Sequence, residues 1–317
     1  MIGDHLEEFG GLPAFDFPEP GPGTAALPDA ATVAWRVSET GWDGDRTWDE
    51  TFTRFLDLVD TAAVTALIVG NWPESYDSTV DAVIGTLIAA QEKLPRLRAV
   101  FLGDITFEEC EISWINQGHI APLLAAFPGL TELGVRGGTE LVFDPVRHEH
   151  LRKLTVEAGG LPAATVRGIA ASELPALTHL ELWLGTSDYG GDAEPADLAP
   201  VLGGEQFPAL RHLGLRNSEI QDRICTAVAS APVVARLESL DLSMGVLTDE
   251  GAAALLTGQP LTHLRSLDLH HNYLSDEMGT RLRQALEPAG VHLDLDSGDA
   301  EEDSDDNEVW RYVSVGE

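Results

Sequence analysis

The sequence predicts an α/β solenoid, in which a curved parallel sheet lies inside, helices lie outside and a cap closes each end. An apolar triplet spaced as L-x-x-L-x-L recurs eight times between residues 64 and 269. Apolar residues at helical spacing lie between the triplets, and prolines mark four of the junctions where a helix would give way to a strand. One such unit cannot bury its apolar face alone, so neighbouring units must stack around a shared core.

Residues 1–62 are expected to form an N-terminal arm and cap. The Gly- and Pro-rich stretch up to about residue 30 predicts an extended arm, and the alternation within residues 33–39 predicts a strand. Residues 47–50 (Thr-Trp-Asp-Glu) have the pattern of a capping box and predict that a helix follows. This block would cover the first repeat, whose edge would otherwise expose core and unpaired strand groups.

The repeats themselves are assigned to residues 63–290. In each triplet the last two apolar residues would point inward from a short strand. The proline at a junction would end the preceding helix because it cannot donate the next backbone hydrogen bond. The triplets begin at Val64, Leu97, Leu130, Leu151, Leu177, Leu210, Leu237 and Leu264, and the junction prolines are Pro95, Pro128, Pro175 and Pro208.

Residues 291–317 are expected to form a C-terminal cap with an acidic loop. Residues 291–295 predict a ninth short strand, and residues 309–315 alternate like a closing strand. The segment 294–308 holds nine acidic residues and no Lys or Arg. Its start faintly resembles a calcium loop, but Asp305 stands where that loop needs a bidentate Glu. We therefore expect a solvated loop, and whether it binds cations stays open.

The last two repeats contain the same phrase twice. Residues 247–250 (Leu-Thr-Asp-Glu) recur 27 residues later as residues 274–277 (Leu-Ser-Asp-Glu). Thr248 and Ser275 would cap helices there, because their hydroxyls can accept from free backbone N–H groups. A 27-residue L-x-x-L-x-L unit followed by this phrase resembles the ribonuclease-inhibitor type of leucine-rich repeat, over roughly residues 64–295.

This resemblance implies a leucine-rich-repeat solenoid and a protein-binding role. The Asn that usually follows the triplet is present once, at Asn272, so the earlier repeats depart from the family pattern. The layout and the terminal strand also resemble small cytoplasmic bacterial leucine-rich-repeat proteins encoded beside ATP-grasp and radical-SAM enzymes. That likeness implies that the partner is a neighbouring biosynthetic enzyme.

The charge balance limits the partners. With 19 basic and 53 acidic residues, the formal net charge is −34. Such a field repels nucleic acid and anionic membranes and steers a basic protein inward. Two cysteines predict no disulfide framework. The acidic first ten residues lack a secretory pattern, and no apolar run reaches the ~20 residues that span a bilayer. We expect a cytoplasmic location, and the scarcity of lysine is typical of a bacterial genome rich in G and C.

Motifs for catalysis are missing from the sequence. It has no Walker loop, no GxGxxG after a strand, no GxSxG and no HExxH. His148 and His150 have the wrong spacing to share a metal on one helix face, and we expect both to be solvated. The sequence therefore predicts no enzyme and no cofactor.

The concave face carries the candidate site. Adjacent strands lie about 4.8 Å apart, so equivalent outward residues of neighbouring repeats should touch. This places His179 beside His212 and Trp183 beside Arg216, with Glu181 facing Asp241 across a glycine. An exposed Trp next to Arg is typical of a binding hot spot, although a Trp packed under a neighbouring loop would fit the same pattern. The insertion after residue 185 would place Tyr189 on a rim.

We therefore expect a non-catalytic scaffold or adaptor that binds a partner protein through its concave face. An acidic inhibitor of a basic protein, such as a nuclease or toxin, is the alternative. A rival of another class is a metal-binding or enzymatic site at His179, His212 and Glu181. The sequence leaves open the partner's identity, the effect of binding and the oligomeric state. The predicted partner-binding residues are Trp183, Arg216, His179, His212, Glu181, Arg136, Asp241, Asp268, His270 and Tyr189.

Overall fold

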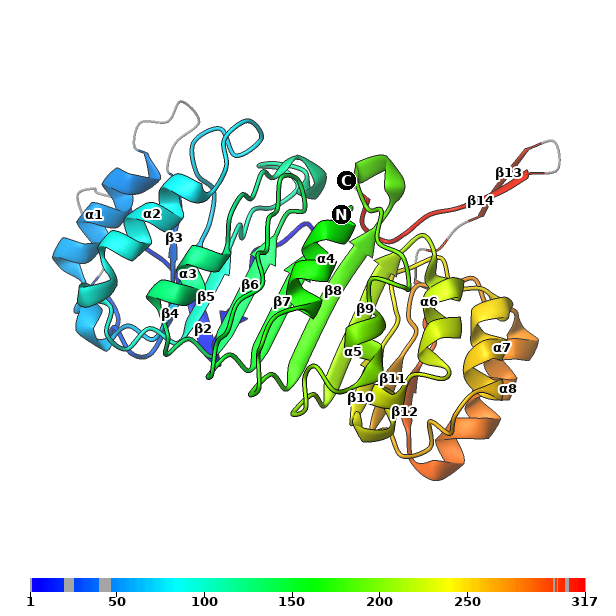
Figure 1. Ribbon diagram of the computed structural model, residues 1–317. Helices are drawn as coiled ribbons and strands as arrows, with labels where there is room; N and C mark the ends of the chain where they lie inside the picture. The colour runs from blue at the N-terminus through cyan, green and yellow to red at the C-terminus, as the bar shows by residue number, and fades with distance from the viewer. Residues whose placement is uncertain are drawn as a thin grey trace.

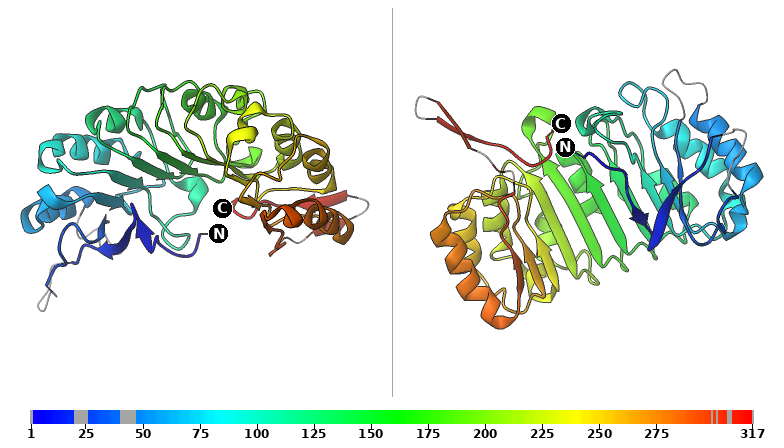
Figure 2. Two further views of the ribbon diagram at one scale, coloured as in Figure 1. Left: turned by 90° about the horizontal axis from the view of Figure 1, so that it is seen from below. Right: turned by 180° about the vertical axis from the view of Figure 1, so that it is seen from behind.

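The computed structural model describes residues 2–19, 26–39, 47–298, 300, 302–305 and 308–316. Within them, twelve strands form one sheet whose spatial order follows the chain from β1 to β12. The sheet bends into an arc with the helices on its outer side, and both chain ends lie on the inner side (Figures 1 and 2). The predicted α/β solenoid is confirmed.

The bounds of the elements follow the repeat. The strands are β1 (Glu8–Phe9), β2 (Leu12–Asp16), β3 (Ala34–Val37), β4 (Ala66–Val69), β5 (Ala99–Leu102), β6 (Glu132–Arg136), β7 (Lys153–Glu157), β8 (His179–Gly185), β9 (His212–Ser218), β10 (Ser239–Asp241), β11 (Ser266–Asp268), β12 (His292–Asp294), β13 (Glu302–Asp305) and β14 (Glu308–Arg311). The α-helices are α1 (Trp48–Leu58), α2 (Asp81–Ala89), α3 (Ala121–Ala126), α4 (Ala163–Ala170), α5 (Ala199–Gly203), α6 (Gln221–Val228), α7 (Asp249–Thr257) and α8 (Asp276–Leu286).

The apolar triplets build one continuous core. Strands β2 to β12 pair in parallel, each with its neighbour in the chain. Leu180 and Leu182 of β8 pair with Leu213 and Leu215 of β9, and all four side chains are fully buried. Because every repeat adds the same two inward positions, the core extends along the whole arc.

The helix caps form as predicted. The Thr47 hydroxyl accepts from the Glu50 N–H, and the Glu50 carboxylate accepts from the Thr47 N–H. The hydroxyls of Thr248 and Ser275 accept at the starts of α7 and α8. The α1 helix buries Trp48 and two phenylalanines and packs beside β3. Trp42, from the same predicted cap, lies outside the described residues.

The N-terminal arm is not simply extended. Residues 8–16 form an antiparallel hairpin, β1–β2, and β2 pairs in parallel with β3. Gly10 and Gly11 make its turn with φ of +60° and +73°, a region that favours glycine. The hairpin folds over the concave face, where Phe9 meets Phe101 edge-to-face at 5.6 Å between ring centroids. The hairpin lies there because the concave side of β3–β5 carries apolar side chains, which the hairpin shields from water.

The C-terminal cap also differs from the prediction. The short strand β12 forms and pairs with β11. Residues 309–311, however, do not close the sheet: β14 pairs with β13, which comes from the acidic segment, in an antiparallel hairpin that projects from the body (Figure 1). Residues 312–316 then run back along the rim towards β8, so that the two chain ends lie near each other (Figure 2). None of the described helices has both the length and the apolar character needed to cross a bilayer.

Candidate partner-binding site on the concave face

His179 and His212 lie side by side on the concave face, as the register predicts. Their rings stack in parallel, with centroids 3.9 Å apart and planes 7° from each other. The Nδ1 atom of His212 lies 2.7 Å from the Ser239 hydroxyl. Burial and the neighbouring His179 lower the pKa of His212 to about 4, so its imidazole is neutral at pH 7.

Glu181 is held from two sides. Its Oε1 atom accepts from the Trp183 indole at 2.9 Å and from the Arg216 guanidinium at 2.7 Å, whereas Oε2 lies 3.6 Å from Nε2 of His179. Burial opposes the charged form, but His179, Arg216 and Trp183 hold the pKa of this carboxyl well below its usual range. Arg216 reaches on to Asp241 at 3.2 Å, so the predicted approach of Glu181 and Asp241 is mediated by an arginine.

The predicted exposure of Trp183 is wrong. The side chain is 8% exposed and packs with Ile112, Met244 and Val315, with Ile2 alongside. The Arg216 guanidinium lies 5.4 Å from the centre of the indole, so the predicted Trp–Arg neighbourhood is correct. Because segments from both chain ends cover the ring, it packs inside the molecule and is not a free anchor.

Asn217 holds the C-terminal segment over Trp183. Its side-chain amide donates to the carbonyl of Val315 at 2.5 Å and accepts from the Val315 N–H at 3.0 Å. The Ser113 hydroxyl donates to the carbonyl of Gly316 at 2.5 Å. Tyr189 lies at the same rim, with its ring near Gly316. Asn217 adopts a φ of +56° at the end of β9, and no sequence motif marked it.

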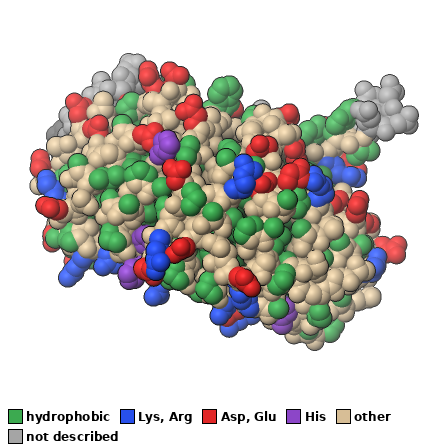
Figure 3. All heavy atoms as spheres, in the orientation of Figure 1, with side chains coloured by type: hydrophobic (Ala, Val, Ile, Leu, Met, Phe, Trp, Pro, Cys, Tyr) green, Lys and Arg blue, Asp and Glu red, His purple; other side chains and the backbone are tan. Residues whose placement is uncertain are grey.

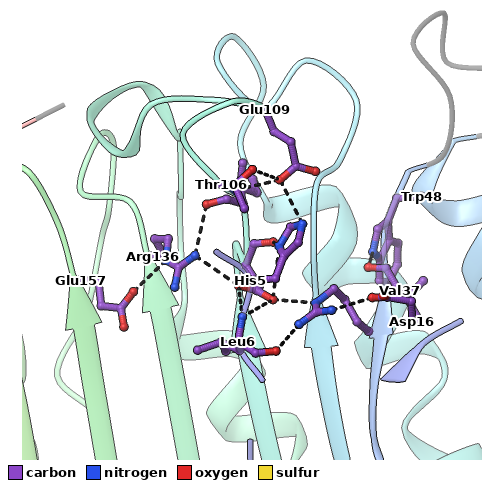
Figure 4. A network of polar contacts seen from close by, with 12 residues as sticks. His5, Leu6, Asp16, Val37, Trp48, Thr106, Glu109, Arg136 and Glu157 are labelled. Atoms are coloured by element: carbon purple, nitrogen blue, oxygen red, sulfur yellow. Dashed lines mark hydrogen bonds and ion pairs between the residues drawn. The ribbon is translucent and has the colours of Figure 1, made fainter. Parts of the chain in front are cut away.

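Arg136 was expected to lie open on the concave face. It is instead only 3% exposed and belongs to a second charged network. Its Nη1 lies 3.2 Å from the carboxylate of Asp104, and its Nε donates to Glu157 at 2.7 Å (Figure 4). Asp104 is fully buried and also accepts from Nε of Arg36 at 2.6 Å. Although burial acts against its charge, the surrounding cations and donors lower the pKa of Asp104.

This Asp104 network fastens the N-terminal segment to the sheet. The Leu6 N–H donates to the Asp104 carboxylate at 3.2 Å, and the Leu6 carbonyl accepts from Arg36. His5 lies 3.6 Å from the same carboxylate, and its hydrogen bond with Asp104 raises the pKa of the imidazole (Figure 4). Sequence reasoning missed Asp104, Arg36 and His5. The available signal was Arg36, a charged residue between the apolar Trp35 and Val37 of the predicted strand.

A row of carboxylates follows the register across the last strands. Asp241 of β10 pairs with Asp268 of β11, which pairs with Asp294 of β12, and Glu181 lies beyond Gly214 on the other side. We call Glu181, Asp241, Asp268 and Asp294 the acidic row. Burial raises the pKa of Asp241 despite Arg216, whereas hydrogen bonds from His270 lower that of Asp268.

Two groups of side chains on this face have the composition of metal ligands. In His179–Glu181–His212 and in Asp268–His270–Asp294, one ligand atom from each residue lies within 4.8 Å of the others. His148, expected to be solvated, is instead 4% exposed: its Nδ1 accepts from the Leu151 N–H at 3.0 Å, and its Nε2 lies 3.2 Å from the Phe127 carbonyl. It therefore stabilises a turn between repeats.

A family match and one solved structure support the fold. Residues 237–256 and 261–277 match the leucine-rich repeat family. A crystal structure of a Bacteroides fragilis protein superposes with a TM-score of 0.76 and 29% identity, over 87% of this chain and 76% of that one. An internalin (InlF) from Listeria monocytogenes gives a TM-score of 0.34 and 16% identity, over 73% and 76%. No curated protein matches the sequence. The repeat pattern, the strand register and the fold of this chain are those of leucine-rich-repeat proteins.

Proposed function

We propose that this chain is a non-catalytic scaffold that binds a basic segment of another protein along the concave side of β8–β12. Leucine-rich-repeat domains generally mediate protein–protein interactions. The observation that carries the proposal is the acidic row. Like charges directly opposite each other on neighbouring strands destabilise a sheet, and lysine or arginine side chains of a partner would relieve that repulsion.

The charge of the row is incompletely balanced within the chain. Among the described residues, the ion pairs of its four carboxylates involve Arg216, His179 and His270. Acidic side chains are also spread over the outer face, with basic ones among them (Figure 3), so excess charge alone does not single out a site. What distinguishes the row is that its carboxylates align in register, so the long lysine and arginine side chains of one partner segment can reach them together.

The other half of the concave face supports the same location. The β1–β2 hairpin covers β3–β5, so a partner would meet the molecule's own N-terminal segment there. Within the site, five predicted residues are partly accessible: His179, His212, Glu181, Asp268 and His270. Asp241, expected to lie open on this face, is instead buried beside Arg216. Trp183 and Arg216 would act by holding Glu181 in place, and Arg136 by holding the N-terminal segment.

The net charge of −34 favours an inhibitor of a basic enzyme as the second candidate within this class. Such an enzyme would present its basic substrate-binding surface to the row and lose activity on binding. An adaptor would bind its partner without stopping its activity. Assaying the captured protein with and without this chain separates the two roles.

Neutralising the row tests the proposal. At low salt, the wild type should retain a basic protein from native lysate, and the triple variant Asp241→Asn, Asp268→Asn and Asp294→Asn should lose it. Association of that protein with the triple variant should be at least 10-fold slower than with the wild type. The matched control removes three exposed acids from the outer side, Asp57→Asn, Glu92→Gln and Glu205→Gln, and changes the net charge equally. Retention by the concave variant and loss by the outer control would contradict the proposal.

A further inference from the structure

Each ring of the stacked pair His179 and His212 has one nitrogen without a hydrogen-bond partner. The Nε2 atoms of both rings are buried and lack a hydrogen-bond partner within the described structure. The 3.6 Å between Nε2 of His179 and Oε2 of Glu181 exceeds an ordinary hydrogen bond. Buried polar atoms are nearly always satisfied, so two unpaired nitrogens in one stacked pair call for a ligand.

Glu181 presents a free oxygen to these nitrogens. The Trp183 indole and the Arg216 guanidinium both donate to Oε1, which leaves Oε2 turned towards His179. Ser239 contacts the other nitrogen of the second ring, Nδ1 of His212. Outer contacts of this kind orient the ligands in protein metal sites, because they hold the carboxylate and the imidazole ring in place.

We propose that His179, His212 and Glu181 bind one Zn²⁺ ion on the concave face. Two imidazole nitrogens and one carboxylate oxygen form the three-ligand set of zinc sites that keep a fourth position open. That position could take water or a side chain of a bound partner. The metal site shares Glu181 with the acidic row, but zinc binding requires no partner and can be tested without one.

The geometry needs a small adjustment. The three ligand atoms lie within 4.8 Å of one another, whereas Zn–N bonds of about 2.0–2.1 Å in a tetrahedron bring ligand atoms to about 3.4 Å. The rings, now parallel to within 7°, would tilt so that their Nε2 atoms converge.

The rival group Asp268–His270–Asp294 is less suited to zinc. Nδ1 of His270 already contacts Oδ1 of Asp268 at 2.8 Å, so a metal would have to displace that interaction. The group also offers one imidazole where the proposed site offers two, and imidazole is the better zinc ligand. It therefore supplies the matched comparison.

The test begins by removing metal from the full chain with a chelator. The chain is then titrated with zinc, and calorimetry measures the binding. We expect one Zn²⁺ per chain, and Co²⁺ should give the visible absorption of a four-coordinate site. His179→Gln and His212→Gln should each weaken binding by at least about 100-fold, since outer-contact changes alone cost 10- to 100-fold. His270→Gln and the exposed His119→Gln should leave the affinity unchanged.

A second readout covers variants that fold less well. Zinc should raise the Tm of the wild type and of His270→Gln, but not that of Glu181→Gln, because a ligand stabilises only the state that binds it. Absence of saturable zinc binding in the wild type would overturn the proposal. So would unchanged affinity in both His179→Gln and His212→Gln, or loss confined to His270→Gln.

Discussion

Replacing Asp104 with Ala is expected to lower the free energy of unfolding by about 3–5 kcal/mol, because it leaves the buried guanidinium groups of Arg36 and Arg136 without their shared carboxylate. The same change removes the acceptor for the Leu6 N–H and the partner of His5. The N-terminal segment should therefore exchange its amide hydrogens faster than the repeats do. Urea unfolding measures the first effect, and hydrogen exchange measures the second.

Asp16→Ala is the matched control for this variant. Asp16 also pairs with Arg36, at 2.6 Å, but its side chain is 78% exposed. Solvent screens such a pair, so its removal should cost less than about 1 kcal/mol. Equal losses from the two variants would show that burial of Asp104 does not set the stability of this network.

Trp183→Ala is expected to destabilise the protein by about 3–5 kcal/mol, the usual range for truncation of a buried large aromatic residue. The change would leave a cavity among Ile112, Met244 and Val315, and it would remove the indole donor to Glu181. Residues near Val315 should lose protection from hydrogen exchange at the same time. Thermal or urea unfolding measures the stability loss.

Trp114→Ala provides the comparison, because the side chain of Trp114 is 58% exposed on the same rim. We expect a stability change within about 0.5 kcal/mol for this surface position. If Trp183→Ala kept full stability but lost a bound partner, the ring would be a binding anchor as the sequence suggested. A large loss of stability would show instead that the Trp183 ring is part of the packing that joins the two chain ends.

The repeats could be predicted from the sequence because each one places the same apolar residues at the same offsets. Once Leu180 is paired with Leu213, all the remaining residues of those two strands are aligned as well. The contact of His179 with His212 follows directly from this register. The acidic row follows from the same register. Local periodicity was sufficient wherever a contact joins equivalent positions of neighbouring repeats.

The positions of the chain ends were beyond this reasoning. Trp183 is covered by Ile2 and Val315, which lie more than 130 residues away in the sequence and outside any repeat. The β1–β2 hairpin could have been suspected, since Ile68 and Phe101 are apolar at positions that face away from the core. Only a segment from elsewhere could bury them. Asp104 gave no comparable signal, because its partners come from three separate parts of the chain.

The most direct test of the scaffold proposal is site-specific photo-crosslinking in native lysate. A photoreactive p-benzoylphenylalanine at position 266 would lie on the concave face beside the acidic row, and one at position 257 would lie at the exposed end of α7 on the outer side. We predict that position 266 crosslinks one basic protein, that raised salt abolishes the crosslink, and that position 257 does not capture it. Capture of the same protein from position 257 alone would contradict binding along β8–β12.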